Sequence, residues 1–79
     1  MSPTVLRVGP YRFFFFSNEG TEPPHVHVRR EGLVAKFGIE PLAVIDSGGF
    51  GARECRKIER LIAAHRRELL EAWNEYFAR

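Results

Sequence analysis

Two histidines, His25 and His27, are the side chains whose type and spacing best suit chemistry in this sequence. They alternate with valines, and a β-strand places residues i and i+2 on one face, here about 6.5 Å apart along the chain. Two imidazoles at that distance can chelate a transition metal, or act as the base and the acid of a cleavage reaction with Lys36 or Arg29 stabilising the developing charge. If the protein is an enzyme, we therefore expect His25, His27 and Lys36 to be its catalytic residues.

A complete metal site within one chain is not expected from these residues. Structural zinc takes four ligands, and the pair supplies two. His65, the third histidine, is predicted on the apolar stripe of a helix on the opposite side of the sheet, where a hydrogen-bonded core histidine is the simpler interpretation. We predict no metal and no cofactor; a site shared between two protomers, each contributing His25 and His27, remains an alternative.

The histidines belong to a strand-rich region that covers residues 1–46. β-branched and aromatic residues predict strands at 4–8 and 11–17, separated by the turn signal Gly9-Pro10. A break at 18–24 precedes a strand at 25–30, the turn Glu31-Gly32 and a strand at 33–39. Residues 41–46 are a candidate fifth, shorter strand. The region is therefore expected to form an antiparallel sheet of four to five strands.

A glycine loop at 47–51 separates the strands from a helix predicted over 52–78, in which a kink near His65 is an option. Gly51 and Glu54 form a weakened capping box at its start. Apolar residues recur at three- and four-residue steps and predict one buried stripe: Cys55, Ile58, Ile62, His65, Leu69, Ala72, Trp73 and Tyr76. The glycine loop lacks the phosphate-binding motif of nucleotide hydrolases, so a flexible turn is expected.

Size and composition limit the protein to one small α+β domain, residues 1–79. The chain has 79 residues and 44% hydrophobic content, and a chain of this length buries only about 60% of the surface that its unfolded form exposes.

Cys55 is the single cysteine, so no internal disulfide can form, and we interpret it as a small buried apolar residue. No secretion signal or membrane-spanning run occurs in the sequence, so a cytoplasmic location without membrane contact is expected.

The alternation of side chains along each strand assigns residues to two faces of the sheet. Val26 and Val28 should face the helix, as should the odd-numbered residues of the 33–39 strand. The 11–17 strand is aromatic on both sides: Tyr11, Phe13 and Phe15 could form the core face while Arg12, Phe14 and Phe16 occupy the other. The opposite, outward face then holds cations and aromatic rings: Arg7, Arg12, Phe14, Phe16, His25, His27, Arg29 and Lys36. One helix covers one face, so the second set of Phe rings is either packed by loops or offered to a partner.

A second group of cations lies on the helix side that faces away from the apolar stripe. It comprises Arg53, Arg56, Lys57, Arg60 and Arg67. A charged, solvated helix face is the commoner explanation for such a row, and a binding surface is the alternative. The formal net charge of +2 permits nucleic-acid binding without predicting it, because phosphate binding needs clustered cations more than a high total.

Over nearly its whole length the sequence resembles a small bacterial family, domain of unknown function four-one-six-zero. The matching stretches are PTVLR at 3–7, YRFFF at 11–15, PPHVHV at 23–28, AKF at 35–37 and EAWNEYF at 71–77. Gly51 departs from the polar capping residue that members more often place there. The resemblance implies one half of a two-gene, toxin–antitoxin-like operon, with His25, His27 and Lys36 as the natural site.

Three functions follow as hypotheses. The leading one is a domain that binds a small protein partner, an antitoxin-like protein or a second copy in a homodimer, motivated by the surplus Phe rings and the resemblance. The second is RNA binding by the outward face, with metal-independent ribonuclease activity as its extension, although we favour a protein without catalytic activity. The third is the metal site shared between protomers.

Overall fold

The computed structural model describes residues 4–17 and 19–78. Residues 1–3 of the expected strand-rich region, residue 18 of the expected break and residue 79 lie outside the described residues. The element order is five strands followed by two helices, the α+β class that the sequence predicts. None of the described helices is long and apolar enough to cross a membrane.

The five strands form one antiparallel sheet in the order β1-β2-β3-β4-β5. Their bounds are β1 Thr4–Val8, β2 Tyr11–Phe14, β3 His25–Arg30, β4 Leu33–Ile39 and β5 Leu42–Asp46. β2 is three residues shorter than the predicted 11–17 strand, because the chain leaves the sheet after Phe14. Turns at Gly9 and Glu31, both with positive φ, join the first and third pairs of strands, as the sequence predicts.

The helical half consists of α1 (Ala52–Ala64) and α2 (Arg66–Tyr76) rather than one continuous helix. The break falls at His65, whose backbone N–H is shared between the carbonyls of Leu61 and Ile62. Its ring Nδ1 also donates to the Leu61 carbonyl oxygen at 2.9 Å. A side chain that enters the backbone ladder is a recognised cause of a helix kink. His65 is half-buried and hydrogen-bonded at this bend.

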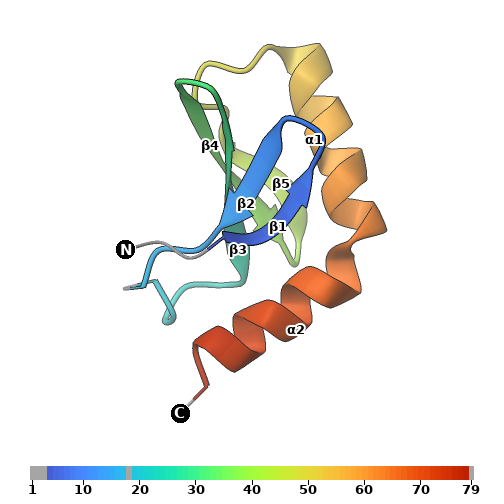
Figure 1. Cartoon of the computed structure of the whole chain (residues 1–79). Coiled ribbons are helices and arrows are strands. Elements are labelled where there is room, and N and C mark those ends of the chain that lie inside the picture. The colour runs from blue at the N-terminus through green and yellow to red at the C-terminus, as the bar shows by residue number, and fades with distance from the viewer. Residues whose placement is uncertain (1–3, 18, 79) are drawn as a thin grey trace.

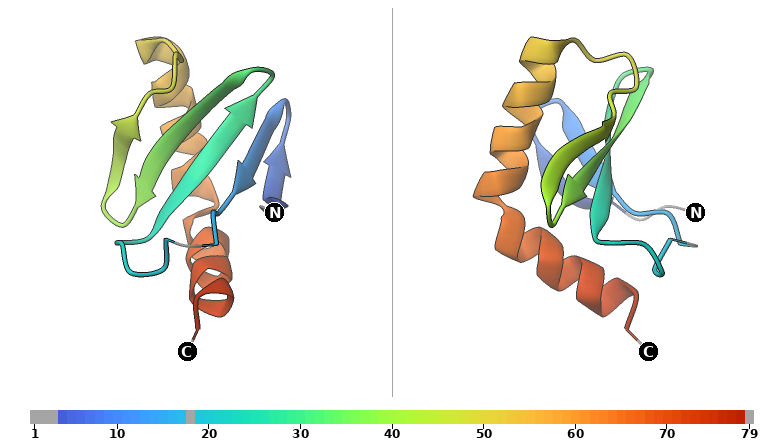
Figure 2. Two further views of the ribbon diagram at one scale, coloured as in Figure 1. Left: turned by 90° about the vertical axis from the view of Figure 1, so that its left-hand side faces the viewer. Right: turned by 180° about the vertical axis from the view of Figure 1, so that it is seen from behind.

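The helices cover one face of the sheet. α1 crosses that face, while α2 turns beneath the end of the sheet at which β3 begins (Figure 1). The left view of Figure 2 looks onto the other face, which no helix covers. We call this the outer face.

The core lies between α1, α2 and the inner face, and it contains the residues that the alternation pattern places there. Phe13, Val26, Val28, Phe37 and Ile39 are fully buried from the strands, and Ile58, Ile62, Leu69 and Trp73 are buried from the helices. Cys55 is also buried, and its thiol lies 3.8 Å from the Phe50 carbonyl oxygen. Burial raises the pKa of this thiol, so Cys55 is held as the neutral, unreactive form.

The start of α1 differs from the expected capping box. Gly51 is the N-cap residue and makes no side-chain hydrogen bond. Glu54 turns to the sheet, where its carboxylate accepts hydrogen bonds from Arg30 at 2.7 and 2.9 Å and from the Tyr11 hydroxyl at 2.6 Å. The Arg30 bond, followed by the Tyr11 bond, holds the pKa of Glu54 below its usual value. Glu54 therefore fixes the first turn of α1 to β2 and β3.

Two glycines with positive φ provide a matched test of the loop that leads into α1. Gly48 (φ +60°) lies against β4 so closely that a Cβ would collide with the backbone of Val34, whereas a Cβ on Gly9 (φ +57°) would meet nothing within 4 Å. Gly9→Ala should therefore lower the free energy of unfolding by about 1 kcal/mol, the cost of left-handed backbone alone. Gly48→Ala should cost about 3 kcal/mol or more, because backbone must also move. Urea denaturation measures both, and equal losses would contradict the close approach.

Candidate functional site

The predicted histidine pair lies on the outer face, but both rings are buried. His25 is 1% exposed and His27 is 7% exposed. The 19–24 loop lies over the rings, and Trp73 of α2 packs against His25 with ring centroids 5.1 Å apart. The face assignment from alternation was right, whereas the expectation that both imidazoles are presented at the surface was wrong. A loop and the second helix cover this end of the sheet.

Glu19 joins the two histidines. Its Oε1 lies 2.8 Å from Nε2 of His25 and 2.9 Å from Nε2 of His27. The other nitrogen of His25, Nδ1, donates to the Pro23 carbonyl oxygen at 3.0 Å. The three residues form a cluster in which the ligand atoms all lie within 4.8 Å of one another. We call it the Glu19 cluster.

The charges in the Glu19 cluster follow from burial and from these bonds. Burial opposes the charged form of Glu19, but the hydrogen bonds from His27 and His25 outweigh it and bring the pKa of Glu19 below its usual value. Burial lowers the pKa of His27, and the Glu19 bond opposes this only in part. At neutral pH the cluster thus holds an ionised Glu19 and a neutral His27 that donates Nε2–H.

Lys36 lies beside the cluster. It pairs with His27 across β3 and β4, and its Nζ lies 3.0 Å from Oε1 of Glu22. Glu22 Oε1 is also 3.8 Å from Nδ1 of His25. The structure thus brings the three predicted catalytic residues together, but each is engaged with a glutamate of the 19–24 loop.

Phe14 and Phe16, the two Phe residues predicted on the outer face, have different surroundings. Phe14 is 4% exposed, stacked on His27 at 5.5 Å and covered by the Arg12 guanidinium at 4.6 Å. Phe16 is 39% exposed and meets the edge of His27 at 4.4 Å. Phe14 is therefore packed by strand side chains of its own chain, and Phe16 is the ring left for a partner.

The predicted arginines of the outer face form a row. Arg7, Arg12 and Arg29 are neighbours across β1, β2 and β3. They line an open hollow together with Thr4, Pro10 and Glu31. This row lies on the same face as the Glu19 cluster, so the outer face gathers all eight residues that the alternation pattern assigns to it.

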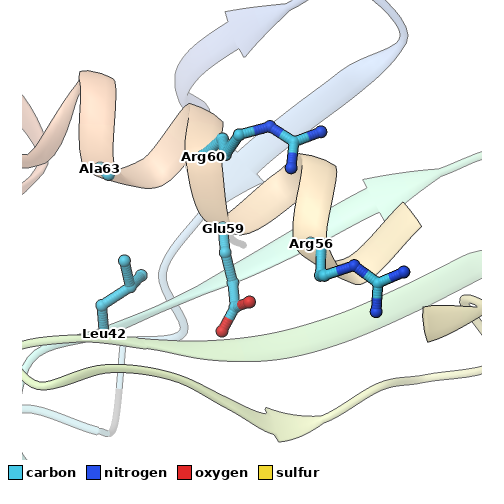
Figure 3. Close-up of a pocket in the computed structure, with 5 residues that line it drawn as sticks. All are labelled: Leu42, Arg56, Glu59, Arg60 and Ala63. Atoms are coloured by element: carbon cyan, nitrogen blue, oxygen red, sulfur yellow. The ribbon is translucent and has the colours of Figure 1, made fainter. Parts of the chain in front are cut away.

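The helix cations are not part of this surface. Arg53, Arg56, Lys57 and Arg60 are exposed on α1, on the opposite side of the sheet. Figure 3 shows Arg56 and Arg60 extending from α1 beside a hollow that Leu42 and Ala63 also line, with Glu59 pointing toward the strands. Arg67 is exposed on α2 and lies 3.8 Å from Glu71. The two predicted cationic groups are therefore separate surfaces.

Glu19 was not predicted, because only the histidines were considered as ligands for a metal. The available signal was its position: it is an acidic residue six places before His25, in a loop that Pro23 and Pro24 hold against the same strand. A loop that returns to its own strand brings such a residue within reach of the outward side chains.

The pH dependence of stability tests the Glu19 cluster. Because the folded state lowers the pKa of His27, the unfolded chain takes up a proton first as the pH falls below about 6.5, and stability is lost. Glu19 acts in the same direction at lower pH: its contribution is present above the unfolded-state pKa and disappears as the pH falls through its lower folded-state pKa. The free energy of unfolding should therefore fall between pH 7 and pH 5. The measurement is urea denaturation in chelator-containing buffer.

His27→Gln should flatten the upper part of this dependence, between about pH 7 and pH 5.5. His65→Gln is the control, because the His65 ring bonds to the Leu61 carbonyl of α1 rather than to Glu19, and it should keep the wild-type slope. An unchanged slope in His27→Gln would show that the buried ring does not govern the pH response.

Comparison with known proteins places this chain in a family. The model of the family described as "Domain of unknown function (DUF4160)" matches residues 11–74, which include both histidines, Glu19 and most of both helices. No curated protein and no solved structure gave a significant match to the chain.

Proposed function

We propose that this chain, which belongs to the family described as a domain of unknown function (DUF4160), binds a protein partner as one component of a toxin–antitoxin-like pair. The observation that carries the proposal is the β5 edge of the sheet. The residues from Ala43 to Asp46 are all exposed, with Val44 at 39% and Ile45 at 55%. Among the described residues β5 pairs with β4 alone.

An apolar edge strand is a ready template for another chain. Its outer backbone N–H and C=O groups can pair with an extended segment, and proteins usually protect such edges with charged side chains or proline. The exposed side chains of β5 are instead Ala43, Val44 and Ile45, with one charge at Asp46. These features support recognition by strand addition, in which main-chain bonds supply affinity and side-chain pockets supply specificity.

A hollow beside β5 supplies such a pocket. It has a volume of about 180 Å³ and lies between the 19–24 loop and the β4–β5 end of the sheet, with Pro23, Pro24, Pro41, Ala43 and Ile45 among its lining residues. Small-molecule sites usually measure about 300–1,000 Å³. The hollow therefore suits a single aliphatic side chain of a partner better than a metabolite.

Charge reversal of the edge surface tests the proposal. The chain is co-expressed with the product of any small gene adjacent to its own, the partner that the family resemblance implies, and the affinity of the purified pair is measured by calorimetry. Ile45→Lys should weaken the complex at least tenfold, because it places a charge against an apolar interface and leaves the fold intact. Ala64→Lys, at another exposed apolar position at the end of α1, should leave the affinity unchanged.

Equal affinities for the wild type and Ile45→Lys would reject this surface. A chain that forms no complex with its operon neighbour would reject the toxin–antitoxin-like pairing. A homodimer that Ile45→Lys dissociates would retain the surface and make a second copy the partner.

The row of Arg7, Arg12 and Arg29 favours RNA as a second candidate ligand. Three guanidinium groups side by side on one sheet face can contact successive phosphates, and Phe16 at 39% exposure can stack on a base. Cleavage by the two imidazoles has weaker support, since both rings are buried and bound to Glu19.

The salt dependence of RNA binding separates this candidate from the first. If the row binds single-stranded RNA, the double variant Arg7→Ser, Arg29→Ser should reduce the slope of log K against log salt concentration by about 1.4, or about 0.7 for each lost contact. Fluorescence anisotropy with a labelled oligonucleotide measures the slope. Arg53→Ser, Arg56→Ser on α1 is the control pair. Equal loss in both pairs would indicate non-specific attraction and reject the arginine row.

A further inference from the structure

We infer that Glu19, His25 and His27 form a binding site for one divalent transition-metal ion within a single chain. Each residue offers one ligand atom, and these atoms all lie within 4.8 Å of one another; Oε1 of Glu19 lies 2.8 and 2.9 Å from the Nε2 atoms of the two histidines. Two imidazoles and one carboxylate are donors that suit zinc and its neighbours in the first transition row. The inference is independent of the β5 surface and revises the expectation that one chain supplies only two ligands.

The hydrogen-bond pattern around His25 requires a cation at this place. A carbonyl oxygen can only accept, so Nδ1 of His25 carries the proton that is donated to Pro23. In a neutral ring Nε2 then has a lone pair, yet it faces a carboxylate oxygen at 2.8 Å. Two acceptors at that distance repel each other unless a positive charge lies between them. A second proton on His25 provides that charge, and so does a metal ion bound to both atoms.

The ligand atoms are close enough together that movements of side chains alone would bring them to metal-binding distances. Zinc binds imidazole nitrogen and carboxylate oxygen at about 2.0–2.2 Å, which places neighbouring ligand atoms of a tetrahedral site about 3.3–3.5 Å apart. The two histidine nitrogens now lie 2.8 and 2.9 Å from Glu19 Oε1. The two separations from Glu19 must each open by about half an ångström, and the two histidine nitrogens, which lie at most 4.8 Å apart, must come to about 3.4 Å of each other to hold the ion.

Packing contacts hold both rings in place, and ligation by His27 requires its other neutral tautomer, in which the proton moves from Nε2 to Nδ1. The Nδ1–H bond of His25 to the Pro23 carbonyl fixes the tautomer that leaves Nε2 for a metal, as outer-shell partners do in known sites. Trp73 packs on His25, and Phe14 stacks on His27. The Glu19 side chain is 16% exposed and provides the solvent-facing side of the cluster.

The local charge also favours a cation. Lys36 is the nearest lysine, and its ammonium group is paired with Glu22 at 3.0 Å. Glu22 thus offsets the charge of Lys36, and the Glu19 carboxylate is the negative charge in contact with the two Nε2 atoms. Glu22 is not a fourth ligand, because its Oε1 lies 3.8 Å from Nδ1 of His25, on the opposite edge of the ring from Nε2.

Three protein ligands leave at least one coordination position for water or for a ligand. This is the ligand count of catalytic rather than structural zinc sites. The ion would also fix the 19–24 loop to β3, since Glu19 comes from the loop and both histidines come from the strand. Metal binding should therefore stabilise the folded chain by mass action.

Metal titration of tag-free, chelator-treated protein at pH 7.5 tests the inference. Calorimetry with Zn²⁺ should show one site per chain with a Kd at or below about 10 µM, and Co²⁺ should give a visible absorption band that Zn²⁺ abolishes. Excess Zn²⁺ should raise the midpoint of thermal unfolding, while Mg²⁺ should not, because two imidazoles are poor ligands for it.

Matched variants assign the ligands. Glu19→Gln and His27→Gln should each weaken Zn²⁺ binding at least tenfold. Glu22→Gln and His65→Gln remove a neighbouring carboxylate and the remaining imidazole, and they should bind Zn²⁺ as the wild type does. The far-ultraviolet circular dichroism of each variant confirms its fold, and the wild-type thermal shift remains a test if a variant does not fold.

Three results would overturn the site. They are the absence of saturable Zn²⁺ binding up to 1 mM together with no thermal shift, equal binding by wild type and Glu19→Gln, and loss of binding in His65→Gln.

Discussion

The C-terminal helices cover one face of the five-stranded sheet, and the described part of the chain contains no second helical layer for the other face. β2 nevertheless carries aromatic rings on both faces, and β3 carries two imidazoles on the outer face. The outer rings must be covered by other means, because exposed aromatic surface is unfavourable in water. The 19–24 loop and the bend at His65, which directs α2 beneath the sheet, provide that cover.

The loop removes the two imidazoles from water, so their ring nitrogens need hydrogen-bond partners within the protein. A buried polar group without a partner costs about 1–3 kcal/mol, and none of the buried side-chain polar atoms of the described residues lacks a partner. One carboxylate oxygen of Glu19 lies within hydrogen-bond distance of Nε2 in both rings. The same contacts bring a carboxylate and two imidazole nitrogens within 4.8 Å of one another. The residues that satisfy the buried rings are therefore also the candidate metal ligands of the outer face.

Most of the fold could be predicted because strand alternation and helix spacing both indicated the same buried core. Alternation placed Phe13, Val26, Val28 and Phe37 inside, and the three- and four-residue spacing placed Cys55, Ile58, Ile62, Leu69 and Trp73 against them. The burial of His25, His27 and Phe14 was not predictable in this way, since it depends on where a loop returns in space. Glu19 was missed for the same reason: six residues separate it from His25, and no periodicity links a loop side chain to a strand face.

The covered outer face depends on the contact of Glu19 with both imidazoles. Long-range nitrogen-15 NMR of the histidine rings in metal-free protein detects this contact. We expect Nδ1 of His25 to carry a proton that is donated to the Pro23 carbonyl and Nε2 of His27 to carry a proton that is donated to Glu19. Glu19→Gln should change the ring signals of both histidines and leave those of His65 unchanged. Ring signals of His25 and His27 that show solvent-averaged tautomers and do not respond to Glu19→Gln would contradict this contact.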